Sequence, residues 1–191
     1  MSVKSLVSDH ILSNTYYYLC TILDDFSRYI LSWHLSPTMG ADDIKHTLVL
    51  AIADTQITHI KVKHRPRLLS DNGPAFISDS LKTFLKRYKM LHVRGAPYHP
   101  QTQGKIERYH RSMKSIIKLD NYYLSSHLEH ALADFVCYYN TQRYHESLDN
   151  VTPADVYFGR QQQILTQRQL IKQQTLALRR NHYLQNSADM R

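Results

Sequence analysis

Hydrophobic and polar positions follow two different periods along the chain. Residues 16–23 and 29–35 are aromatic and β-branched runs, and the polar segment 24–28 separates them. Runs of this composition on either side of a short turn predict two antiparallel strands. Short apolar runs at residues 68–69 and 91–93 predict two more strands, and the first of these stops at a Gly-Pro loop.

Apolar side chains recur at helical spacing in the segments between and after these strands. This period predicts helices near residues 41–55, 78–89, 106–118 and 128–139, and from residue 161 into the tail. We expect the tail helix to project and its last ten residues to be frayed, because they lack a strong period. The order of elements predicts an α/β fold, a mixed sheet flanked by helices with a C-terminal helical extension. Residues 95–104 are rich in Pro, Gly and polar side chains and predict a surface loop.

Positive charge is concentrated in one part of the chain. The 191 residues include 24 Lys and Arg against 16 Asp and Glu, and residues 61–118 hold fourteen of the basic residues but three of the acidic ones. Clustered cations displace counterions from phosphate backbones, so this segment indicates a nucleic-acid partner. A solvated basic face is the alternative interpretation. The hydrophobic share of 42 % excludes a wholly disordered chain.

The two cysteines, Cys20 and Cys137, lie far apart in apolar runs. They form neither a disulfide framework nor a zinc-binding set, which indicates a reducing, intracellular environment. The longest apolar runs are too short to span a membrane, so we expect a soluble protein with no membrane partner.

Asp71 and Glu107 are two of the few acids in the basic segment. Asp71 follows a predicted strand, and Glu107 opens a predicted helix with a basic face. Carboxylates near bound phosphates can hold Mg²⁺, and two such ions can activate a hydroxyl and stabilise the leaving oxygen of a phosphodiester. Alternatively, Asp71 caps a turn and Glu107 pairs with Lys105 or Arg111.

Several motifs in order resemble one family. The segments are 23–28 (LDDFSR), 69–74 (LSDNGP), 97–108 (PYHPQTQGKIER), 138–148 (YYNTQRYHESL) and 152–154 (TPA). Together they are similar to the integrase core of bacterial insertion-sequence transposases, relatives of retroviral integrases with a DDE active site. The 35 residues between Asp71 and Glu107 match the spacing of that family's second and third acids. The resemblance covers about residues 16–180.

The resemblance implies a ribonuclease-H-like fold and a specific chemistry. In that family three carboxylates bind two Mg²⁺ (or Mn²⁺) ions, cut a transposon end and join its 3′ hydroxyl to target DNA. Asp71 and Glu107 would be the second and third acids and metal ligands. The residues expected to contact DNA phosphates are Lys105, Arg108, Arg111, Lys114 and Lys118. Transposon-end and target DNA, further copies of the chain and a cytoplasmic, nucleoid-associated location are also implied.

The first acid of the family pattern is missing. It is expected on the opening strand near Ser5, and residues 1–15 do not resemble the family; Asp9 is the nearest carboxylate and the candidate replacement. We therefore expect an N-terminally truncated core at residues 1–158, with an atypical opening segment 1–15, and a helical tail at 159–191. Loss of one ligand would impair cleavage and strand transfer.

Two other functions remain open from the sequence. A ribonuclease-H-like nuclease would cut DNA without joining it, although the motif at residues 97–104 disfavours this alternative. A non-catalytic DNA-binding or subunit-interaction module would bind without Mg²⁺-dependent cleavage. The identity of the third carboxylate decides whether the chain is an enzyme.

Overall fold

The computed structural model describes residues 2–12, 15–59, 61–95 and 104–189. Its strands are β1 (Ser2–Leu12), β2 (Thr15–Leu23), β3 (Ile30–Ser36), β4 (Leu68–Ser70) and β5 (His92–Arg94). Its α-helices are α1 (Ala41–Thr55), α2 (Pro74–Ile77), α3 (Asp79–Arg87), α4 (Gly104–Ile117), α5 (Ser125–Thr141), α6 (Pro153–Tyr157) and α7 (Gln161–Asp189). Single 3-10 turns occur at η1 (Ile57–His59), η2 (Val62–His64) and η4 (Glu146–Leu148).

The five strands form one mixed sheet in the order β3-β2-β1-β4-β5, with β1 at its centre. β2 pairs antiparallel with β1 and β3, whereas β4 runs parallel to β1 and β5. The antiparallel pair predicted from residues 16–23 and 29–35 is therefore confirmed. In the register, Ser5 lies opposite Cys20 and Ser2 lies opposite Leu69. Within the sheet, the carboxyl end of β4 therefore lies beside the first half of β1.

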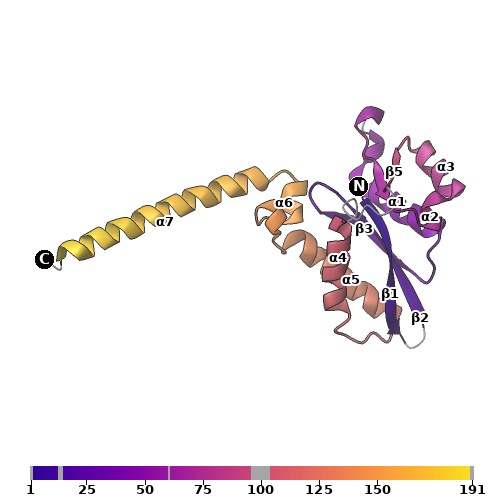
Figure 1. Ribbon diagram of the computed structural model, residues 1–191, viewed down its shortest axis with the longest axis horizontal. Coiled ribbons are helices and arrows are strands. Elements are labelled where there is room, and N and C mark those ends of the chain that lie inside the picture. The colour runs from indigo at the N-terminus through magenta and orange to yellow at the C-terminus, as the bar shows by residue number, and fades with distance from the viewer. Residues whose placement is uncertain (1, 13–14, 60, 96–103, 190–191) are drawn as a thin grey trace.

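Helices cover both faces of this sheet (Figure 1). On β2, Cys20 and Ile22 face one core with α1 and α3, while Leu19 and Leu23 face a second core with α4 and α5. This split follows from the two-residue period of a strand whose faces are both buried. The second core includes Tyr109, a fully enclosed residue of α4. The predicted mixed sheet flanked by helices is confirmed.

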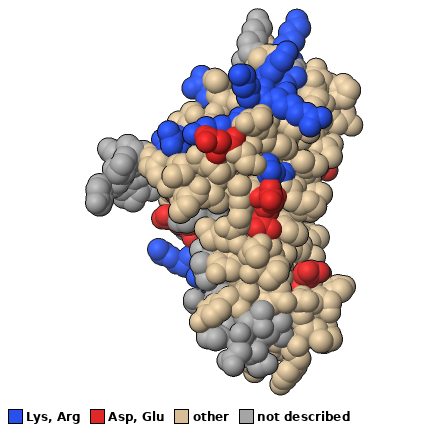
Figure 2. All heavy atoms as spheres, turned by 90° about the vertical axis from the view of Figure 1, so that its right-hand side faces the viewer, with Lys and Arg blue, Asp and Glu red and all other residues tan. Residues whose placement is uncertain are grey.

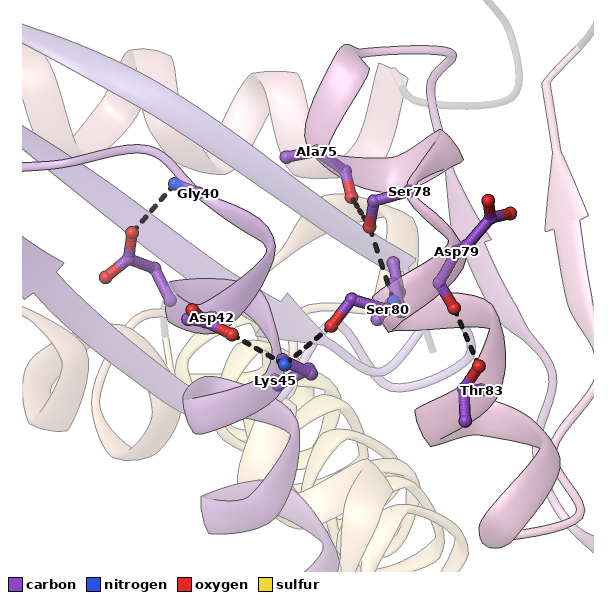
Figure 3. Close-up of polar contacts among 10 residues, drawn as sticks. Gly40, Asp42, Lys45, Ala75, Ser78, Asp79, Ser80 and Thr83 are labelled. Carbon is purple, nitrogen blue, oxygen red and sulfur yellow. Dashed lines mark hydrogen bonds and ion pairs between the residues drawn. The ribbon is translucent and has the colours of Figure 1, made fainter.

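Polar contacts fix α1 against α3 (Figure 3). Lys45 Nζ pairs with Asp42 on its own helix and donates to Ser80 Oγ at 2.8 Å. Ser78 Oγ accepts from Leu81 N at 3.3 Å and so caps α3. Its hydroxyl also donates to Ala75 O at 2.9 Å, which ties α2 to the start of α3.

The C-terminal helix leaves the rest of the fold (Figure 1). Ile164 and Leu165 pack on a small core that contains Val151 and Val156, and the later turns of α7 are exposed. The prediction of a frayed last ten residues is wrong over the described part, because α7 continues to Asp189. After Gly159 the chain contains neither Gly nor Pro, so nothing in its composition terminates the helix earlier. None of the described helices combines the length and the apolar character that crossing a membrane requires.

Candidate functional site

Asp71 lies directly after β4, where the sequence predicted a strand ending in a loop. It is half-buried, and its Oδ1 accepts from Gly73 N at 2.9 Å. A Cβ at Gly73 would lie 3.0 Å from that oxygen, a tight contact that glycine avoids. The turn-capping contact considered from the sequence is therefore present. This hydrogen bond uses one carboxylate oxygen of Asp71 and one backbone donor. It does not by itself fill the capacity of the carboxylate to accept further bonds.

The loop after β4 is hydrogen-bonded to the residue that follows β5. Asn72 Nδ2 donates to Gly95 O at 2.9 Å, and Gly95 N donates to Ser70 O at 2.9 Å. The chain thus leaves the sheet beside Asp71 and is described again from the first residue of α4, with Glu107 exposed in the first turn of that helix. α4 packs against β1. The loop predicted at residues 95–104 lies outside the described residues from 96 to 103.

The backbone register distinguishes the two positions considered for the first acid, those of Ser5 and Asp9. Two residues beyond the Ser2–Leu69 pair, Lys4 is level with Asp71 and Ser5 is the next residue along β1. Asp9 is five residues beyond that level, about 16 Å along an extended strand. It also lies where the pairing of β1 with β2 shifts register. The register therefore brings the backbone of Ser5, and not that of Asp9, close to the level of Asp71.

The acids of the described residues do not complete a metal site. No group of three or more His, Cys, Asp or Glu side chains that could hold a metal ion occurs in the part of the chain that the structure describes. Asp71 and Glu107 carry the carboxylate oxygens that Mg²⁺ prefers, but among the described residues no third acid groups with them. The donor set therefore does not fit the family's two-ion site.

Three of the five predicted DNA-binding residues line one pocket. Lys105, Arg108 and Arg111 of α4 contribute to a cavity of about 190 Å³. Lys105 Nζ also donates to Asp25 Oδ2 at 2.7 Å, so it pairs with the turn after β2. Lys114 and Lys118 lie further along the chain, where they border a small apolar hollow between α4 and α5. The structure thus divides the predicted set into two groups.

Two arginines of this pocket were missed from the sequence. Arg28 comes from the turn between β2 and β3, and Arg143 follows α5. Arg143 places its guanidinium carbon 5.9 Å from the ring centroid of Tyr139. Both belong to motifs that the sequence analysis recognised, residues 23–28 and 138–148, and that carried no assigned role. The motifs were the available signal, but their meeting point depends on the tertiary fold.

Burial and positive neighbours set the electrostatics of the pocket wall. Burial, with smaller contributions from Arg143 and Arg28, lowers the pKa of His145 to about 4. Burial raises the pKa of Tyr139 to about 12 despite the three nearby arginines, Arg143, Arg28 and Arg108. At neutral pH the imidazole and the phenol are both uncharged, so the charge of the pocket comes from its Lys and Arg side chains.

The lowered pKa of His145 predicts acid sensitivity. The unfolded chain takes up a proton on this residue below about pH 6.5, whereas the folded chain does so only near pH 4. The free energy of unfolding should therefore fall across this window, by about 1–2 kcal/mol because solvent screens the half-enclosed ring. Urea unfolding at pH 7 and pH 4.5 measures the fall. His145→Gln should reduce it, exposed His127→Gln on α5 should not, and equal falls in both variants would contradict the assignment.

The fold and the position of Asp71 define the class of protein. A five-stranded mixed sheet with helices on both faces and an acid after β4 is ribonuclease-H-like. Two family models, each described as "Integrase core domain", match residues 6–100 and 88–153. The chain belongs to this family, as a catalytic core of the retroviral integrase superfamily.

Retroviral polyproteins are among its relatives. The Pol polyprotein of equine infectious anemia virus (strain Wyoming) is 32 % identical over 136 residues, which is 67 % of this chain and 11 % of that protein. The Gag-Pro-Pol polyprotein of mouse mammary tumor virus (strain BR6) is 42 % identical over 71 residues, which is 35 % of this chain and 4 % of that protein. The chain thus spans about a tenth or less of the length of these relatives.

Solved integrase cores share its fold. The catalytic core domain of BIV integrase superposes with a TM-score of 0.57 at 20 % identity, covering 86 % of this chain and 96 % of that one. The HTLV-2 integrase catalytic core domain in complex with magnesium gives a TM-score of 0.61 at 18 % identity, covering 81 % and 92 %. The predicted ribonuclease-H-like fold is confirmed.

Proposed function

We propose that the chain is the DNA-binding core of an insertion-sequence transposase whose strand cleavage and transfer are impaired. The main observation is that Asp71 directly follows β4, beside the Asn72–Gly95 hydrogen bond, and that Glu107 lies in the first turn of α4. These are the positions that the family pattern gives to the second and third acids. The family match supports a role in DNA integration or transposition.

The impairment follows from the acid count. Asp71 and Glu107 would supply two carboxylates toward Mg²⁺ or Mn²⁺, and Ser5 stands where the family pattern places the first acid. A divalent ion in such a core neutralises charge on a reacting phosphodiester. A hydroxyl at Ser5 is a weak substitute for a carboxylate, because Mg²⁺ favours anionic oxygen ligands. We propose that the basic first half of α4 now serves to bind DNA without efficient cleavage.

Positive surface supports the DNA partner. On the face seen in Figure 2, Lys and Arg gather at the end that corresponds to the η1–η2 and α3 part of Figure 1. Exposed basic side chains in this part of the fold are Lys61, Arg67, Lys82, Lys86, Arg87 and Lys89. Because integrase cores are described in dimeric and trimeric forms, we also propose self-association of this chain on DNA.

A DNA-binding and cleavage assay on the full chain tests this function. A fluorescent duplex titrated at several salt concentrations should bind, and its affinity should fall as salt rises because phosphate contacts release counterions. With Mg²⁺ present, neither cut nor joined product should exceed the background without protein. Absence of salt-sensitive binding would contradict the DNA-binding function. A Mg²⁺-dependent joined product that disappears in Asp71→Asn would contradict the impairment.

A further inference from the structure

The basic pocket is built from three distant segments of the chain. Arg28 comes from the turn after β2, α4 contributes three basic residues, and Arg143 follows α5. The five cationic side chains are Arg28, Lys105, Arg108, Arg111 and Arg143. Glu107 lies on the same helix but does not line this cavity. The pocket is therefore separate from the acid set proposed for catalysis.

The lining of this pocket has no charge compensation of its own. No acidic side chain is among the residues that line it, and Asp25 reaches Lys105 from the adjoining turn. Burial, and the neighbouring Arg108, lower the pKa of Arg28 while the carboxylate of Asp25 opposes the change. Like charges around one cavity repel one another, so an anion bound among them would relieve a cost that the empty pocket carries.

The arginines are held in place by backbone contacts. Arg28 has a left-handed conformation, with φ of 67°, and its N donates to Asp24 O at 2.9 Å. Non-glycine residues seldom adopt this conformation, and the turn imposes it through hydrogen bonds from Ser27 N and Oγ to Asp24 Oδ2. Arg143 N donates to Tyr138 O at 3.0 Å at the end of α5. Guanidinium groups on fixed backbones lose less entropy when they bind an anion.

A neutral polar group completes the pocket. The Nε2 atom of His145 is buried and has no hydrogen-bond partner among the described residues, and its ring packs edge-on against Tyr139 with centroids 4.8 Å apart. Because this nitrogen is enclosed in the wall, the ring adds an uncharged, rigid surface beside the cationic side chains and is not itself assigned to the anion.

We propose that this pocket binds a phosphate of a nucleic-acid backbone, with Arg28 and Arg143 as its principal ligands. The inference rests on the proposed DNA-binding function and adds a specific anchor to it. A phosphate group fits within 190 Å³, and the pocket shares Arg28 and Lys105 with an adjoining open hollow of about 550 Å³. The adjoining hollow also carries the carboxylates of Asp24 and Asp25, so we assign one backbone phosphate to the basic pocket and none to the hollow.

Salt-dependent DNA binding by charge variants tests this anchor. Arg143→Gln and Arg28→Gln in the full chain should each weaken binding of a fluorescent duplex about tenfold at physiological salt. Each should also reduce the slope of log affinity against log salt by about 1. Arg111 is exposed at the edge of the pocket, so Arg111→Glu should weaken DNA binding as strongly as these two changes without disturbing the packing of the core. The matched control is Arg179→Gln on the exposed part of α7, which should retain native affinity and slope.

The outcomes separate this inference from the proposed function. If the native chain binds no DNA, the proposed function fails and the anchor fails with it. If the native chain binds DNA and the three pocket variants, shown to be folded by circular dichroism, keep native affinity and slope, the anchor alone is wrong. A third outcome would assign the pocket to free phosphate and overturn the inference. In it, inorganic phosphate raises the melting temperature of the native chain but not of Arg143→Gln, and Arg143→Gln binds DNA as the native chain does.

Discussion

Replacing Ser5 by aspartate should raise Mg²⁺-dependent DNA cleavage about a hundredfold or more above the native chain. The register of β1 with β4 puts Ser5 one residue beyond the level of Asp71. The family pattern gives this position to the first acid, so a carboxylate introduced there would complete three acids where two are now available. A hundredfold gain corresponds to about 2.7 kcal/mol of barrier lowering, which lies within what a bound metal ion supplies.

Two measurements and two controls make this gain specific. Mn²⁺ binding by electron paramagnetic resonance should rise in Ser5→Asp together with the amounts of cut and joined DNA. Ser8→Asp adds the same charge about 10 Å further along β1 and should give neither effect. Ser5→Asp combined with Asp71→Asn should return to background. Equal Mn²⁺ binding by Ser5→Asp and Ser8→Asp, with no cleavage by either, would refute the assignment of Asp71 and Glu107.

Replacing Asn140 by leucine should lower the free energy of unfolding by about 2–5 kcal/mol. This buried amide accepts from Ile30 N at 2.9 Å and donates to Ile30 O at 3.0 Å. It thereby satisfies both backbone groups at the first residue of β3. Leucine would leave them buried without partners, at a cost of about 1–3 kcal/mol each. Urea unfolding monitored by circular dichroism measures the loss.

A neighbouring surface residue provides the comparison for Asn140. Gln142→Leu changes an exposed position at the end of the same helix and should alter stability by no more than about 0.5 kcal/mol. Because β3 follows the turn that carries Arg28, Asn140→Leu should weaken DNA binding in parallel with its loss of stability. A variant as stable as the native chain would show that water replaces the lost hydrogen bonds.

Local pattern was sufficient to predict most of the fold. Residues 16–23 have a two-residue period, and α1 and α3 have a helical period. In each of these segments the buried face is continuous, so the spacing of the apolar residues along the sequence indicates which side chains are buried. The short helices α2 and α6 were missed because four or five residues are too few to display a period. α5 begins at Ser125, earlier than the predicted residue 128. Its first turn is mostly exposed and lacks an apolar stripe.

The candidate site was predictable only where one segment determines it. The position of Asp71 after a strand follows from the sequence around it and is confirmed, whereas its catalytic role stays a prediction. Arg28 and Arg143 are separated by 114 residues and meet only because α5 packs beside the turn after β2. No local period encodes such a meeting. The central place of β1 was likewise invisible in residues 1–15, since it depends on pairing with β4.

The long C-terminal helix sets a distance. With 29 residues rising about 1.5 Å each, α7 is a rod of about 44 Å whose first turns alone are anchored to the small core near Val156. B-form DNA advances about 3.4 Å per base pair, so the rod matches the length of about thirteen base pairs. Anything attached to its far end is therefore held more than one helical turn of DNA away from the arginine pocket, and that separation follows from the backbone geometry of a single helix.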